Sequence, residues 1–220
     1  MRPRLAVTVL ALLLPAAPAR AAEPIGECRI PDSATVEAVG GRLVVWSTSF
    51  ADRYGDVTTR HVACRRSTGS RVRVIETYDD GIDRFTATRF AVAGDRVAYA
   101  DEFLDHYGTQ FLSIAVFDAR RRRVVRRVEV GVDRPFAEPL RASIDVLVVT
   151  RAGGIAYVKR RSSDRDENGR VVERVALRAT DTAGSRLLDK GEGIDPASVR
   201  LSGSTLTWTN AGDSRSATLH

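Results

Sequence analysis

Acidic and amide side chains gather at residues 164–169, in the segment DRDENG, at a spacing that could bind calcium. Asp164, Asp166, Asn168 and Gly169 fill the first, third, fifth and sixth places of a calcium loop of the EF-hand kind. The twelfth place of such a loop needs a carboxylate, but Val175 stands there. Asn168 and Gly169 also explain the segment without a metal, because both tolerate positive φ in the tight turn of a β-hairpin. The sequence favours this turn and no cofactor, with a weak Ca²⁺ site as the alternative.

A second pattern, F-x-D-x-Y-G, occurs at residues 50–55 and again at residues 103–108. A ring and a carboxylate presented together suit a sugar or a peptide, because the ring stacks and the carboxylate accepts hydrogen bonds. The candidate ligand-binding residues are therefore Asp52, Tyr54, Asp105 and Tyr107. The same residues also have a structural explanation, which duplication favours: Asp accepts backbone N–H bonds in turns, and Gly supplies the special dihedral angle.

Catalytic signals are weak along the whole chain. The segment DEFLDHYG places Asp101, Glu102, Asp105 and His106 close together, but Arg53 replaces the histidine in the sister loop. The chain contains no G-x-S-x-G, H-E-x-x-H, G-x-G-x-x-G or P-loop pattern. We therefore predict no catalytic residue, and a protein that is not an enzyme.

The first 21 residues have the features of a secretory leader. Arg2 and Arg4 precede a short apolar stretch, and Ala19-Arg20-Ala21 is the small-x-small pattern of a cleavage site. The stretch is too short to span a bilayer, and no later segment reaches the roughly 18 apolar residues that a spanning helix needs. We therefore expect residues 22–220 to form an exported protein without a transmembrane segment.

Charge gives little reason to expect a nucleic-acid partner. The leader carries three arginines and no acid, so its removal lowers the formal net charge from +6 to +3. The strongest basic run, ARRRRVVRRVEV at residues 119–130, is predicted to cover a turn and an outermost strand. Charges on an exposed edge strand discourage edge-to-edge pairing, which is a sufficient reason for them. Binding of an anionic envelope polymer is the alternative.

Cys28 and Cys64 are the two cysteines of the chain. In an oxidising compartment one disulfide between them is the simplest prediction, and two free thiols are the alternative. The bond would close a loop of about 36 residues and contribute roughly 3–4 kcal/mol of stability.

The chain repeats itself. Residues 40–66 align with residues 93–119 at a shift of 53 without a gap. Two weaker copies follow at 152–160 and 201–210, and in every copy a glycine precedes a short strand that ends near an aromatic residue. These aromatic residues are Trp46, Tyr99, Tyr157 and Trp208. We expect them to occupy the same place in four copies of one sheet module.

The strands around each copy also correspond. An alternating run comes first, then the aromatic-ended strand, a third strand such as HVACR or LSIAVFDA, and a fourth such as VRVIETY or VVRRVEV. Strands of this length, with β-branched alternation and Gly, Asp and Ser turns, are typical of antiparallel meanders. The predicted repeats cover roughly residues 33–84, 85–136, 137–195 and 196–220, the last without its fourth strand.

In this pattern the chain resembles exported bacterial β-propeller-type repeat proteins over nearly its whole mature length. The resemblance implies an all-β fold of about four antiparallel four-stranded blades. The segment ECRIPDS could supply the missing strand and close the ring, whereas a Cys28–Cys64 disulfide would pull it toward the first copy. An open array or a twisted sandwich is therefore an alternative to a closed ring.

These features lead to two functional hypotheses. The first is a secreted, non-enzymatic binding or scaffold module at the cell envelope or outside it, with an envelope polymer, a glycan or a protein as partner. The second is a propeller-type hydrolase, lactonase-like or glycosidase-like, with carboxylates near the central axis. Glu37 and Asp145 are the acids that the predicted innermost strands offer to such a centre.

Overall fold

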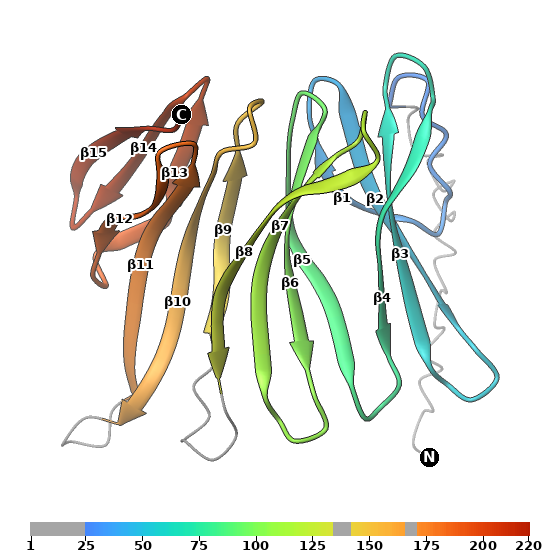
Figure 1. Cartoon of the computed structure of the whole chain (residues 1–220), viewed down its shortest axis with the longest axis horizontal. Helices are drawn as coiled ribbons and strands as arrows, with labels where there is room; N and C mark the ends of the chain where they lie inside the picture. The colour runs from blue at the N-terminus through green and yellow to red at the C-terminus, as the bar shows by residue number, and fades with distance from the viewer. Residues whose placement is uncertain (1–24, 134–141, 166–170) are drawn as a thin grey trace, which may run out of the picture.

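The computed structural model describes residues 25–133, 142–165 and 171–220, in which every regular element is a β-strand (Figure 1). The first repeat contains β1 (Thr35–Val39), β2 (Leu43–Ala51), β3 (Val57–Arg65) and β4 (Arg71–Asp79). The second contains β5 (Arg84–Ala93), β6 (Arg96–Leu104), β7 (Gln110–Asp118) and β8 (Arg123–Asp133). The third contains β9 (Ala142–Val149), β10 (Ile155–Arg165), β11 (Val171–Asp181) and β12 (Gly184–Lys190). The fourth contains β13 (Ile194–Ser202), β14 (Thr205–Asn210) and β15 (Asp213–Thr218). In these ranges no helix is long and apolar enough to cross a bilayer.

Each repeat is an antiparallel meander whose strands pair in chain order. The first two repeats form one eight-stranded sheet, because β4 and β5 pair through Tyr78↔Phe85 and Asp79↔Arg84. The third repeat is a four-stranded sheet and the fourth a three-stranded sheet. The all-β, β-propeller-like architecture predicted from the sequence is confirmed, including the missing fourth strand of the last repeat.

The repeats follow one another in an open array. Their first strands lie side by side, β5 against β1 and β9, and β9 against β13. Figure 1 shows the first repeat at one end of the molecule and the fourth at the other. The disulfide between Cys28 and Cys64 is present and holds the N-terminal segment on β3, where Glu27 N–H also donates to the carbonyl of Arg66 (2.8 Å). The segment ECRIPDS therefore does not complete the last repeat, and the suggestion that it closes the ring is wrong.

The four aromatic residues of the repeats occupy equivalent places. Trp46, Tyr99, Tyr157 and Trp208 stand on β2, β6, β10 and β14, the second strands of their repeats, and each is at most 4% exposed. The last three pack into the core against the preceding repeat. Trp46, in the first of the described repeats, packs instead with Cys28 and Cys64 beneath the N-terminal segment.

Polar contacts fasten the last repeat to the third. The buried Asp189 carboxylate of β12 accepts hydrogen bonds from Trp208 Nε1 (2.7 Å), Asn210 Nδ2 (3.0 Å) and Arg215 Nη1 (2.8 Å). Burial alone would raise the pKa of Asp189, but the hydrogen bonds from Trp208, Asn210 and Lys190 N–H, together with the Arg215 charge, outweigh it and hold the pKa below its usual value. A nearly complete set of donors thus fixes the position of the three-stranded sheet.

Candidate functional site

The two F-x-D-x-Y-G segments form matching loops, between β2 and β3 and between β6 and β7. In the first loop, Asp52 Oδ1 accepts hydrogen bonds from the backbone N–H groups of Tyr54 (2.7 Å) and Asp56 (3.1 Å). In the second, Asp105 Oδ1 accepts hydrogen bonds from the backbone N–H groups of Tyr107 (2.9 Å) and Thr109 (2.7 Å). One carboxylate oxygen of each Asp therefore closes its own turn.

The tyrosines of these loops project into solvent, at 74% exposed for Tyr54 and 68% for Tyr107. The guanidinium of Arg53 lies 4.7 Å from the centre of the Tyr54 ring, and the His106 ring lies 3.8 Å from the Tyr107 ring. The rings are available to a ligand, whereas the aspartates are already engaged in their turns. Ligand binding by these Asp–Tyr pairs stays a prediction.

The calcium prediction lies largely outside the described residues. Asp166 and Asn168 belong to 166–170, and Asp164 stands on β10, at a position where only the backbone is described. The strands β10 and β11 pair antiparallel up to the residues that flank this segment, so it joins the two arms of a hairpin as predicted. Within the described ranges, no three His, Cys, Asp or Glu side chains come together to hold a metal ion.

The structure also brings together five aromatic residues that lie far apart in the sequence. Strand register pairs Phe50 with Thr58, Thr58 with Tyr78, Tyr78 with Phe85, Phe85 with Phe103, and Phe103 with Phe111. Directly paired residues of an antiparallel sheet project from the same face. The five aromatic residues therefore form one line across β2–β7, here called the aromatic row: Phe50, Tyr78, Phe85, Phe103 and Phe111.

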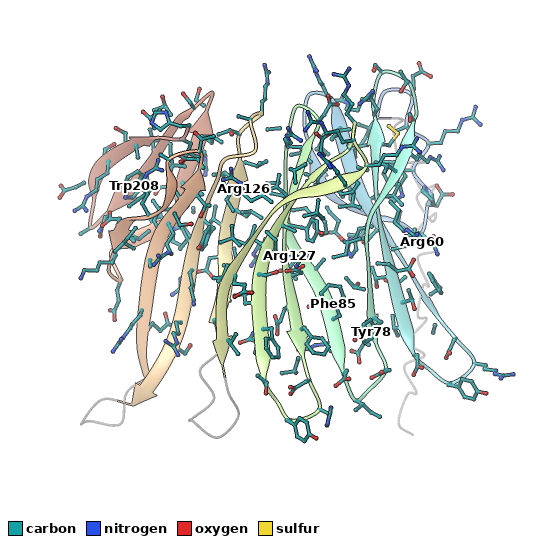
Figure 2. All side chains as sticks on the ribbon, viewed as in Figure 1. Arg60, Tyr78, Phe85, Arg126, Arg127 and Trp208 are labelled. Atoms are coloured by element: carbon teal, nitrogen blue, oxygen red, sulfur yellow. A yellow bond between two sulfur atoms is a disulfide. The ribbon has the colours of Figure 1, made fainter. Side chains whose placement is uncertain are left out.

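The aromatic row is accessible rather than buried in the core. Phe50, Tyr78 and Phe111 are 41–48% exposed, and the other two members are partly buried. Ring centres are 6.2 Å apart for Tyr78 and Phe85, and 5.9 Å apart for Phe103 and Phe111. Figure 2 shows Tyr78 and Phe85 next to one another, below Arg60 and Arg127 in this view. The row thus offers ring faces and edges to a molecule in solution.

A pocket of about 330 Å³ lies over the second-repeat half of the row. Phe85, Phe103 and Phe111 form its apolar side, together with Val132, which pairs with Phe111 and extends the line onto β8. The polar side comes from the neighbouring positions on the same strands, Asp101, Ser113, Arg127 and Glu129. Apolar rings beside a few convergent polar groups are the usual composition of a ligand site.

The polar side of the pocket is held in place by a buried carboxylate. Asp101 is 2% exposed and accepts from Arg127 Nη1 at 2.5 Å and from the hydroxyl of Ser113. The same Arg127 nitrogen lies 2.8 Å from Ser113 Oγ, while the Arg127 side chain remains 49% exposed. This network orients the guanidinium, which stays half-exposed at the polar side of the pocket. Burial, together with the Asp101 carboxylate, raises the pKa of the adjacent Tyr99 to about 12, so this phenol stays protonated at neutral pH.

The acids considered for a hydrolase do not share a site. Glu37 lies on β1 and accepts a hydrogen bond from Ser47 Oγ (2.6 Å). Asp145 lies on β9, with β5 between the two strands, and accepts from Arg160 Nε (2.7 Å). Each carboxylate is thus engaged within its own repeat.

Sequence reasoning missed the aromatic row and its pocket. The alignment of the repeats already equated Phe50 with Phe103, which was a usable signal. Tyr78, Phe85 and Phe111 carry no motif and join the row only through the register of β4, β5 and β7. The buried Asp101 was noticed only as a member of an acidic cluster, without its partner Arg127 on β8.

Comparisons with known proteins place the chain in no family. No protein-family model matches it, and none of the curated proteins matches it. Among solved structures, the chain is similar to a polysaccharide lyase of family PL25, an ulvan lyase bound to a -[GlcA(1-4)Rha3S]- unit, at a TM-score of 0.38 and 9% identity. This likeness covers 76% of the chain and 53% of the lyase. A second similar structure is the β-propeller domain of the trilobed protease of Pyrococcus furiosus, which has an open velcro topology, at a TM-score of 0.30 and 10% identity. It covers 83% of the chain and 64% of that domain, and neither likeness bears on function.

Proposed function

We propose that this protein is a non-enzymatic binding module that holds an extended, uncharged glycan along the aromatic row. The observation that carries the proposal is the registered line of five partly exposed rings on neighbouring strands. Strands in a sheet lie about 4.8 Å apart, so the five steps from β2 to β7 span roughly 24 Å. From Tyr78 on β4 to Phe111 on β7 the row offers a contact at every strand, at intervals close to the width of one pyranose ring. Rings accessible at this spacing suit stacking on successive sugars.

The polar groups beside the row suit hydroxyl groups. Arg127 supplies N–H donors whose direction Asp101 fixes, and Glu129 in the same pocket supplies an acceptor. A donor and an acceptor side by side match the paired hydroxyls of a sugar. A protein interface of the same area would place fewer charged groups next to its apolar centre.

Local charge balance favours an uncharged polymer. Asp101 neutralises Arg127, and Glu76 lies 3.1 Å from Arg60 near the other end of the row. Among the described residues, Glu129 of the pocket has no ion-pair partner, so a polyanion would meet an unpaired negative charge there. This separates the proposal from the anionic envelope polymer suggested by the basic run.

Substitution of exposed row members tests the proposal. Tyr78→Ala and Phe111→Ala, at sites 42% and 41% exposed, should leave the fold intact. Each should weaken binding of hydroxyethylcellulose, xylan or mannan about 5–10-fold in affinity electrophoresis and calorimetry, because an aromatic contact contributes roughly 1–1.5 kcal/mol. Tyr54→Ala and Tyr107→Ala, which remove exposed rings outside the row, are the matched controls.

Three outcomes would count against the proposal. If no neutral glycan binds, the proposal is wrong. If polygalacturonate or alginate binds more tightly than the neutral glycans, the ligand is not an uncharged polymer. Release of new reducing ends from any of these glycans would replace it with the hydrolase alternative.

A further inference from the structure

A large hollow in the described part of the chain lies away from the aromatic row, along the first strands of three repeats. It measures about 640 Å³ and is here called the axial groove. Its walls are the ends of β5 (Ala91–Ala93), β9 (from Val148) and β13 (Val199–Leu201), and Leu219 closes one side. The aromatic row is formed at the opposite end of β5, at Phe85, so the two sites are separate.

The groove runs along strand edges rather than over a sheet face. Ala91, Val92 and Ala93 all line it, as do consecutive residues of β9 and β13, although neighbouring residues of a strand point to opposite faces. At these positions β5 pairs with β6, β9 with β10, and β13 with β14, so each strand has its other edge unpaired. Unpaired edges present rows of backbone N–H and C=O groups.

Side chains give the groove an apolar floor and a positive rim. Val92, Val148 and Leu201 are partly exposed apolar members of it, and Arg151 and Arg200 are exposed at its border. Among the described residues that line the groove, none is acidic, so both guanidinium charges are uncompensated within it. An occupant with acidic groups would complement this charge.

We propose that the axial groove binds an extended peptide segment with alternating apolar and acidic side chains, which adds as a strand to the edge of β9 or β13. Its backbone would pair with the unpaired edge, its apolar side chains would cover Val148 and Leu201, and its carboxylates would meet Arg151 and Arg200. Pairing of this kind gives affinity through the main chain and selectivity through alternate side chains.

The unpaired edges favour a peptide over an amphiphile with an acyl chain. An acyl chain would bury backbone N–H and C=O groups without replacing their hydrogen bonds to water, and each unsatisfied group costs about 1–3 kcal/mol. An extended peptide supplies a donor and an acceptor at every second residue of the strand edge.

A displayed library of linear dodecapeptides, selected against the full chain, tests this site. Enriched peptides should alternate apolar and acidic residues, and synthetic copies should bind in fluorescence polarisation. Arg151→Glu with Arg200→Glu should weaken them by at least about tenfold, because like charges would face each other. Arg53→Glu, an equal charge change in the exposed β2–β3 loop, should leave binding unchanged. A proline in the middle of the peptide should abolish binding, because it removes a backbone donor.

The proposal would be overturned if the selection enriched no peptide. It would also be overturned if the enriched peptides bound the Arg151→Glu, Arg200→Glu variant as well as the wild type, or still bound with a proline in the middle. The proposal would also be overturned if dodecanoate bound while no peptide did, and if the Arg151→Glu, Arg200→Glu variant lost this dodecanoate binding. Glycan binding by the aromatic row is measured separately and depends on none of these outcomes.

Discussion

At the scale of single residues, His61 is the titratable group most at odds with its surroundings. It is 3% exposed between the first two repeats, its ring stacks on Phe90 at 4.8 Å, and its Nδ1 atom has no hydrogen-bond partner. Glu37 Oε1 lies 3.9 Å from Nδ1, too far for a hydrogen bond. Burial lowers the pKa of His61, and the Glu37 charge opposes this only in part. The folded protein therefore disfavours the protonated form of this imidazole.

The free energy of unfolding should consequently fall as the pH is lowered through the range in which histidine titrates. The unfolded chain takes up the His61 proton near pH 6.5, whereas the folded chain resists it to lower pH. The contribution of the neutral imidazole is complete above pH 6.5 and is lost as pH falls toward the folded-state pKa. Urea unfolding between pH 7.5 and 5 should show this decline, and His61→Phe should flatten it. His106→Gln, at an exposed histidine, should retain the wild-type slope; an equal flattening there would contradict the assignment.

At the scale of elements, the three-stranded fourth repeat depends on one side chain of its neighbour. Asp189→Ala removes the acceptor shared by Trp208, Asn210 and Arg215 and leaves buried donors unsatisfied. The free energy of unfolding should fall by about 2–4 kcal/mol, and amide exchange should rise first in β14. Asp195→Ala, which removes an exposed acid that closes a local turn at Ala197, should cost less than about 1 kcal/mol. Equal losses in both variants would contradict the special role of Asp189.

The elements were largely predictable from the sequence, because their signals are local. Alternation, glycine turns and the repeated aromatic position of Trp46, Tyr99, Tyr157 and Trp208 specify the meanders. The Cys28–Cys64 bond followed from having two cysteines and a predicted leader for export. Each of these features is readable within a window of one repeat.

The candidate site was not predictable, because it depends on register between strands. Tyr78 meets Phe85 only because β4 and β5 pair at one end, and irregularities in β3–β4 and β5–β6 shift the pairing elsewhere. A slip of one residue would send Phe103 to the other face and break the row. The ion pair between the buried Asp101 and the half-exposed Arg127 likewise joins residues 26 positions apart on non-adjacent strands.

At the scale of the whole molecule, an open stack needs two ends that do not attract another copy. The N-terminal segment covers Trp46 at one end. At the other end, the outer face of the fourth repeat carries hydroxyl side chains, with Thr205 opposite Thr218 and Thr207 opposite Ser216, all exposed. A polar outer face is what a terminal repeat requires for solubility.

Making this face apolar should therefore cause self-association. A variant with Thr205→Val, Thr207→Val and Ser216→Val replaces three exposed hydroxyls with methyl groups, keeps the size of the two threonine side chains and adds one further methyl at residue 216. Sedimentation velocity at increasing concentration should show dimers or larger species, because sheets with apolar faces stack. The control variant with Thr205→Ala, Thr207→Ser and Ser216→Thr should self-associate less than the triple-valine variant. A triple-valine variant that stays monomeric at all concentrations would show that the hydroxyls do not keep the molecule single.

The two ends differ in chemistry, and this has a consequence for where the protein can work. Hydroxyl groups on the fourth repeat are indifferent to redox conditions, but the covering of Trp46 is fastened by a bond that thiols can cleave. In a reducing medium one end would lose its covalent fastening and the other would not. The molecule would then become adhesive on a single side, and would pair head to head instead of growing into a filament.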